Sequence, residues 1–155
     1  MTIIVQTASD KKIICRPDTT WNKENKDFYV PDNFGEICFT PILFAKVSKA
    51  GRCVGAEFAE RYYDSVGYGV LLYNARQLKN DVYGVAEASC WDNSSFLPFP
   101  MFNRVTLGGE NSFNLYSDKH EVFSTSGEYE KMIEDAICAA SETVSLRIGD
   151  MIATE

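Results

Sequence analysis

Short apolar runs separated by turn residues dominate the first part of the chain. The stretches "TIIVQT" and "KKIICRP" flank the polar turn "ASDKK", and Pro17 ends the second of them. A third run, "KDFYV", is closed by Pro31 and Asp32. Short runs with β-branched residues between turn signals are typical of strands. The pattern therefore predicts a pair of strands followed by a third short strand.

A longer apolar run, Ile37–Val47, is interrupted by Pro41. Proline lacks the N–H that a sheet ladder needs, so we expect an edge strand or two bent strands here. The stretch "SKAGR" has the residues of a hairpin turn, and "YGVLLYNA" predicts a buried strand. Further on, "FNLYSDKHEVFST" predicts a hairpin around residues 117–119. The late stretch "LRIGDMIATE" predicts a turn that enters a buried strand.

Helical spacing is found in two segments. In "GAEFAERYYDSV" the apolar residues Phe58, Tyr62 and Val66 fall at i, i+4 and i+8. We expect the carboxylates of this segment to lie on a solvated helix face; they are Glu57, Glu60 and Asp64.

The clearest helical pattern is "SGEYEKMIEDAICAASETV", where Thr125 and Glu128 have the spacing of a capping box. One apolar face follows, formed by Met132, Ile133, Ala136, Ile137 and Ala140. Many short strands with two helices indicate an α+β, strand-dominated fold with a sandwich or roll core. A chain of 155 residues is most economically one domain, 1–155.

Composition and charge exclude several classes of function. The net charge of −7 argues against nucleic acid as a partner, because phosphate binding needs a basic face. The start, "MTIIVQTASDKK", has neither the pattern of a secretory signal nor that of a membrane span. Five cysteines without a Cys-x-x-Cys pair predict reduced, mostly buried thiols in a cytoplasmic protein. The single histidine, His120, has no Cys or His at ligand spacing and is expected to be exposed.

Three stretches stand in a recognisable order: "RPDTTWNKENKDFYVPD", "AERYYDSVGYGVLLYNARQL" and "LRIGDMIATE". Their order and spacing resemble those of the fumarylacetoacetate hydrolase-like family. Members have a Lys-Pro segment, a Glu-x-Glu strand, a strand with Asp-x-x-Ala-Arg-Asp-Leu-Gln and a late Gly-Asp-x-Ile-x-Thr-Gly-Thr-Pro. The resemblance runs from about Ile13 to the end of the chain. It implies a mixed β-roll fold, here truncated at both ends, in a protein that is usually dimeric.

The resemblance also implies a chemistry. Family members hold Mg²⁺ or Mn²⁺ on three carboxylates, and the cation polarises a 2-oxo acid so that an enolate can leave. The family's two glutamates fall at Thr40 and Ile42 in this sequence, and its aspartate falls at Leu71 or Leu72. A hydroxyl and apolar side chains cannot replace three carboxylates. We therefore expect that this chain binds neither Mg²⁺ nor Mn²⁺.

Other parts of the family's site differ as well. Its lysine falls at Ser89 and Cys90, and "MTIIVQTASD" has no counterpart of its His-bearing lid. Three residues are candidates for a remnant pocket: Arg16, Arg76 and Asp92. Each arginine could hold a carboxylate ligand or form a structural ion pair. Asp92 could line the pocket or belong to a local Asx turn.

We interpret the chain as a non-catalytic member of this family, with a structural or partner-binding role as a homodimer or with a related active protein. One alternative is a hydrolase, decarboxylase or isomerase of 2-oxo acids with a relocated or absent metal. Asp92 with Glu36 or Glu57 would supply its carboxylates. Another is a module that binds an organic anion through Arg16 or Arg76. The apolar run "FLPFPMF" is either a loop packed on the core or a partner surface.

Overall fold

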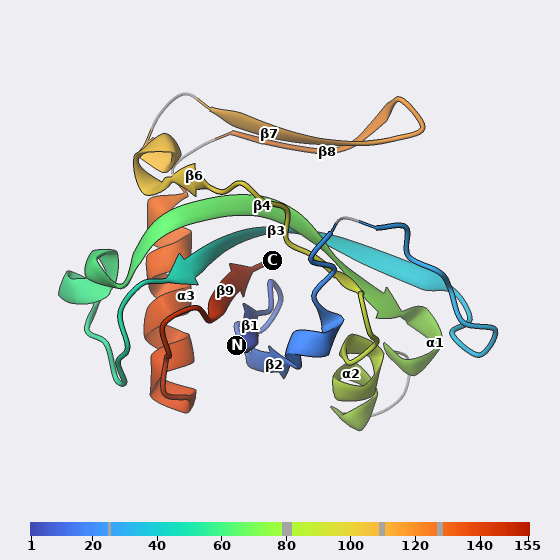
Figure 1. The fold of residues 1–155 in the computed structure, drawn as a ribbon, viewed down its shortest axis with the longest axis horizontal. Coiled ribbons are helices and arrows are strands. Elements are labelled where there is room, and N and C mark those ends of the chain that lie inside the picture. The colour runs from blue at the N-terminus through green and yellow to red at the C-terminus, as the bar shows by residue number, and fades with distance from the viewer. Residues whose placement is uncertain (25, 79–81, 109–110, 127–128) are drawn as a thin grey trace.

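The computed structural model describes residues 1–24, 26–78, 82–108, 111–126 and 129–155. Within these residues a seven-stranded sheet has the order β2-β1-β9-β3-β4-β5, and β6 pairs with β4. Its strands are β1 (Ile3–Gln6), β2 (Ile13–Arg16), β3 (Ile37–Val47), β4 (Tyr63–Asn74), β5 (Ser95–Phe96), β6 (Phe102–Asn103) and β9 (Met151–Thr154). Figure 1 shows β3 and β4 arching over β9, β1 and β2, so the sheet is strongly curled.

A separate two-stranded sheet pairs β7 (Ser112–Ser117) with β8 (His120–Ser126), and Figure 1 places this hairpin beyond β4. The α-helices are α1 (Ala75–Leu78), α2 (Val82–Ser89) and α3 (Glu130–Thr143). Three 3-10 helices are η1 (Asp18–Thr20), η2 (Ala56–Tyr62) and η3 (Arg104–Gly108). The predicted α+β, strand-dominated fold is confirmed. In the described part of the chain, no helix is long and apolar enough to cross a membrane.

Strand β3 is one continuous strand in the interior of the sheet, so the predicted edge strand or pair of bent strands is wrong. It pairs with β4 along its whole length, but with β9 only from Leu43 to Lys46. Pro41 lies outside that second ladder. The missing N–H of Pro41 is therefore tolerated because only one neighbouring strand pairs at this position.

Strands β3 and β4 are antiparallel neighbours joined by residues 48–62, so the predicted hairpin turn at "SKAGR" is only the start of a longer connection. Gly51 forms an isolated bridge with Leu146. The predicted helix behind it is reduced to η2, and the chain enters β4 at Tyr63. Phe58 is 45% exposed and Val66 belongs to β4, so the i, i+4, i+8 pattern did not mark one helix face.

Helix α3 packs on one face of the curled sheet. Ile133, Ala136, Ile137 and Ala140 are buried in a cluster with side chains of β1, β3, β4 and β9, as the apolar pattern predicted. Met132 is 38% exposed and lies at the margin of this face.

The predicted capping box does not begin this helix. Thr125 belongs to β8, where its hydroxyl lies 2.7 Å from the Tyr129 hydroxyl, and Glu128 lies outside the described residues. Tyr129 occupies the N-cap position without a side-chain capping bond.

Two further expectations are wrong. The "KDFYV" run forms no strand: Tyr29 is 84% exposed, and no described strand pairs with it. The cysteines are free thiols but are not buried, because Cys15, Cys53 and Cys90 are exposed and the other two are half-buried. The run "FLPFPMF" is divided, with Leu97 buried and Phe99 and Phe102 exposed.

Close packing of β4 against β5 generates a first prediction. A Cβ at Gly69 would overlap the carbonyl oxygen of Phe96, a backbone atom that cannot move aside alone. Gly69→Ala should therefore lower the free energy of unfolding in urea by about 1–3 kcal/mol. The matched control is Gly108→Ala, where the nearest atom to the new Cβ is a flexible Glu130 oxygen at 3.4 Å. That variant should stay within about 0.5 kcal/mol of the parent. Equal effects would contradict the close β4–β5 approach.

Candidate functional site

The positions assigned to the family's metal ligands share one face of the sheet. Thr40 is the register partner of Leu71, and Ile42 is the partner of Gly69. Residues directly opposite each other in an antiparallel pair point to the same face, as do alternate residues of one strand. Ile42 and Leu71 are buried there in an apolar cluster with Phe44 and Tyr73. The assignment of these positions as former ligands stays a prediction; Leu72, the other candidate, points to the opposite face.

Arg16 is the central charged group on this face. It ends β2, and its side chain is fully buried. One terminal nitrogen donates to the Ser95 hydroxyl at 2.6 Å and lies 3.4 Å from the Ser94 carbonyl oxygen. The other donates to the Leu72 carbonyl oxygen at 2.6 Å. The guanidinium thereby ties β2 to β4 and to the segment that enters β5.

No described carboxylate lies within 4 Å of this guanidinium, and its Nε has no hydrogen-bond partner. Burial lowers the pKa of Arg16, while the nearby Tyr73 and Glu155 act in the opposite direction. The carbon of the guanidinium lies 4.6 Å from the centre of the Tyr73 ring. Arginine remains charged even when its pKa falls. The charge of Arg16 is therefore stabilised by its hydrogen-bond acceptors and by the Tyr73 ring instead of by an ion pair.

Tyr73 connects this cation to the end of β9. Its hydroxyl donates to Glu155 Oε1 at 2.6 Å, and the Ala8 N–H donates to the other oxygen at 3.3 Å. Burial raises the pKa of Tyr73. The charge of Arg16 lowers this pKa, whereas the nearby Glu155 raises it further. The phenol therefore keeps its proton and serves as a donor to the carboxylate.

This arrangement does not fit a divalent cation at the positions that the resemblance implies. Thr40 offers a neutral hydroxyl, while Ile42 and Leu71 offer no ligand atom. Magnesium and manganese require several oxygen ligands, and carboxylates supply most of their stabilisation in proteins. The buried Arg16 on the same face adds a like charge. Among the residues that the structure describes, no cluster of His, Cys, Asp or Glu could hold a metal ion.

The other two pocket candidates differ from Arg16 in their exposure to solvent. Arg76 is exposed, and its Nε is the nearest atom, at 3.6 Å, to a Cβ built on Gly35. Asp92 is exposed as well. No hydrogen bond or ion pair within the described chain joins either residue to Arg16. The three candidates are therefore not joined by direct polar contacts, and a shared pocket stays a prediction.

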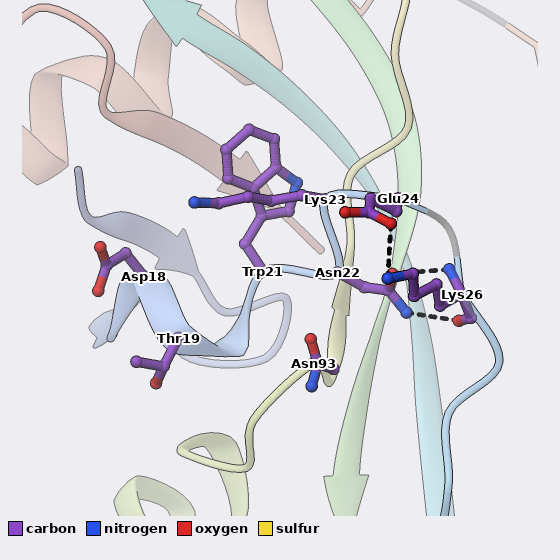
Figure 2. Close-up of a pocket in the computed structure, with 8 residues that line it drawn as sticks. All are labelled: Asp18, Thr19, Trp21, Asn22, Lys23, Glu24, Lys26 and Asn93. Atoms are coloured by element: carbon purple, nitrogen blue, oxygen red, sulfur yellow. Dashed lines mark hydrogen bonds and ion pairs between the residues drawn. The ribbon is translucent and has the colours of Figure 1, made fainter.

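An open pocket of about 330 Å³ adjoins Asp92 through its neighbour Asn93 (Figure 2). Its wall is mostly polar, with Trp21 as the one aromatic member and Lys23 5.3 Å from the indole centre. Glu24 is paired with Lys26 at 2.6 Å. In the same segment the Thr20 hydroxyl lies 3.0 Å from the Ser95 hydroxyl that holds Arg16. The segment after β2 therefore contacts the serine that binds the buried guanidinium.

The sequence pattern singled out Arg16 but missed its partners. Leu72 contributes only a backbone carbonyl, and Ser95 stands far from Arg16 along the chain. Tyr73 and Glu155 were not identified as site residues either. A fully buried arginine requires such acceptors, so the one usable signal was the placement of Arg16 at the end of an apolar strand.

Solved structures with a similar fold were found over the whole chain. Fumarylpyruvate hydrolase from Pseudomonas aeruginosa, solved with Mn²⁺ and pyruvate, matches 100% of this chain and 78% of its own, with a TM-score of 0.80 and 13% identity. A fumarylacetoacetate hydrolase family protein from Yersinia pestis CO92 matches 99% of this chain and 80% of its own, with a TM-score of 0.77 and 14% identity.

This chain has the fold of the fumarylacetoacetate hydrolase family. The resemblance deduced from the three sequence stretches is thereby confirmed at the level of the fold. A third structure of this kind, 5-carboxymethyl-2-hydroxymuconate delta-isomerase from Mycobacterium smegmatis, matches 98% of this chain and 66% of its own, with a TM-score of 0.80 and 13% identity. No family model and no curated protein sequence matches the chain.

The buried guanidinium generates a second prediction. Arg16→Met would leave the Leu72 carbonyl and the Ser95 hydroxyl without their donor, so the free energy of unfolding should fall by about 2–4 kcal/mol. Arg16→Lys should recover part of this loss, because one ammonium cannot reproduce the planar fork. The control is Arg52→Met at an exposed position, which should change stability by less than about 0.5 kcal/mol. Urea unfolding measures all three, and an Arg16→Met variant as stable as the control would refute the role of Arg16.

Proposed function

We propose that this chain is a non-catalytic relative of the fumarylacetoacetate hydrolases that lacks their divalent-metal site and has a structural or partner-binding role. One observation carries the proposal: the face with Ile42 and Leu71 is closed by apolar packing and holds a fixed cation, Arg16. A catalytic metal instead needs anionic oxygen ligands and an open coordination position. The exposed free thiols of this chain support a reducing compartment, which we take to be the cytoplasm.

Calorimetric titration with Mn²⁺ tests the loss of the metal site. After treatment with a chelator, the protein should give no binding heat up to millimolar Mn²⁺, because no carboxylate set replaces its hydration shell. The fumarylpyruvate hydrolase from Pseudomonas aeruginosa, whose structure contains Mn²⁺, is the positive control in the same buffer. Stoichiometric binding at micromolar concentration would overturn the assignment of Thr40, Ile42 and Leu71.

The alternative of an active enzyme is favoured by the similar structures, which are named as hydrolases and an isomerase. Under this alternative, exposed Asp92 would act as an acid or base on a 2-oxo acid. Turnover of an acylpyruvate, followed by its absorbance with and without Mn²⁺, separates the two proposals. Turnover that is lost in Asp92→Asn would favour the enzyme. Stabilisation by oxalate without turnover would favour the organic-anion module, with Arg76 as the accessible cation.

For the partner we favour a second copy of this chain. An open groove of about 670 Å³ has Met101, Phe102 and Ile148 in its wall. Phe102 is 57% exposed and Ile148 is 71% exposed, and apolar side chains gathered in one groove are typical of interaction surfaces. The association would cover these side chains.

Light scattering after size exclusion tests this association. The parent should have about twice the monomer mass of 17.4 kDa, and Phe102→Ser should shift it toward the monomer. Tyr29→Ser, which removes an exposed aromatic residue outside the groove, is the control and should leave the mass unchanged. A monomeric parent at high protein concentration would exclude the homodimer.

A further inference from the structure

A further cavity is lined by Leu43, Tyr68 and Thr154, which point to the face of the sheet opposite Arg16. It has a volume of about 80 Å³ and is enclosed by β3, β4, β9, the β7–β8 hairpin and the start of α3. Leu43 of β3 and Tyr68 of β4 are register partners that point into the α3 side of the sheet. Ile42 and Leu71 belong to the cluster on the other side. The cavity thus opens on the α3 side of the sheet, although Ile42 of the other cluster and Glu155, the acceptor of the Tyr73 hydroxyl, also belong to its lining.

The wall of this cavity contains an unsatisfied hydroxyl group. Thr154 is 2% exposed, and its Oγ1 has no hydrogen-bond partner. Among the described residues the wall has three further hydroxyls, on Tyr68, Thr125 and Tyr129, and the last two lie 2.7 Å apart and satisfy each other. A buried hydroxyl without a partner destabilises a protein by about 1–3 kcal/mol, so such a group in a native protein calls for an explanation, of which a bound molecule is one.

The remainder of the wall is aromatic and carries no positive charge. The rings of Tyr68 and Phe113 are stacked with centroids 4.3 Å apart, and Phe123 lies 6.2 Å from Phe113. None of the described residues that line the cavity is Lys, Arg or His, and Glu155 contributes a carboxylate residue. An anionic ligand would therefore find no counter-ion here. A neutral ring would find offset and edge contacts.

Water alone is a poor occupant of this cavity. A buried water makes two to four hydrogen bonds, roughly, and apolar cavities stay dry. Of the fully buried polar side-chain atoms in its wall, only Thr154 Oγ1 lacks a hydrogen-bond partner within the described residues. Phe123 and Met132 also line the cavity, and they are 37% and 38% exposed, so both side chains border solvent. Methionine in particular adapts to irregular shapes.

We propose that this cavity binds a small neutral aromatic molecule with one hydroxyl group, a phenol, whose hydroxyl pairs with Thr154 Oγ1 and whose ring packs against Tyr68, Phe113 and Phe123. The ring occupies the apolar part of the cavity, and the hydroxyl supplies the hydrogen bond that Thr154 lacks. This site requires no metal and no contact with Arg16. It is thus independent of whether the chain is catalytic.

The test compares phenol with toluene, which has the same shape but no hydroxyl. Titrations of the full chain are followed by NMR chemical shifts. Phenol should bind the parent about tenfold more tightly than toluene, the equivalent of one net hydrogen bond. Thr154→Val, which keeps the shape and removes the hydroxyl, should abolish this preference, and Thr154→Ser should retain it. Absence of phenol binding to the parent, or a preference that survives in Thr154→Val, overturns the proposal.

Thermal unfolding without ligand supplies the matched control. Thr20 is also buried, but its hydroxyl donates to the Pro17 carbonyl oxygen at 2.8 Å and lies 3.0 Å from the Ser95 hydroxyl. Thr20→Val should lower the melting temperature, because it removes satisfied bonds. Thr154→Val should leave the melting temperature unchanged or raise it. A decrease equal to that of Thr20→Val means that the Thr154 hydroxyl already has a partner, and the proposal fails.

Discussion

The alternation of side chains along the paired strands β3 and β4 is the constraint on which the two candidate sites depend. With Leu43 opposite Tyr68 and Thr40 opposite Leu71, one set of side chains faces α3 and the other faces the cluster beside Arg16. A slip of one residue would exchange the two faces. The ladder resists such a slip because Phe44 occupies the space above Gly67, where any side chain would collide with its ring. The register between β3 and β4, more than any single contact, therefore decides which side chains each face of the sheet offers to a ligand.

The sequence predicted those elements that have a local pattern. The pair β1 and β2, the β7–β8 hairpin and the apolar face of α3 are each marked by turn residues or by period. The order of the strands in the sheet is not indicated by any local sequence pattern. Strand β9 lies between β1 and β3, and the Thr2 N–H bonds to Asp150, 148 positions away along the chain. Strands β1 and β9 pair in parallel because the whole sheet curls and brings them together. A short stretch of sequence carries no information about such a pairing.

The prediction from sequence failed where one spacing of apolar residues suits both a helix and a strand. Tyr62 and Val66 suited a helix face, yet Val66 is equally suited to the inward side of a strand and is buried there. Short apolar runs cannot separate helix from strand by period alone. The candidate site was predicted only in part for a related reason. The resemblance supplied Thr40, Ile42, Leu71 and Arg16, whereas the groups that hold Arg16 are a backbone carbonyl and a distant hydroxyl, which leave no trace in a motif.

Two buried side-chain atoms of the described residues lack a hydrogen-bond partner, Arg16 Nε and Thr154 Oγ1. Their surroundings differ, and so does what each unsatisfied atom indicates. Arg16 still makes charge-assisted bonds to Leu72 and Ser95 and lies over the Tyr73 ring, so a single unmatched N–H is a small deficit in a well-stabilised group. Thr154 has no hydrogen-bond partner for its hydroxyl, and the residue lines a cavity. Since a hydroxyl is easily replaced by a methyl group of the same shape, an unsatisfied threonine inside an apolar wall is the stronger indication of a ligand.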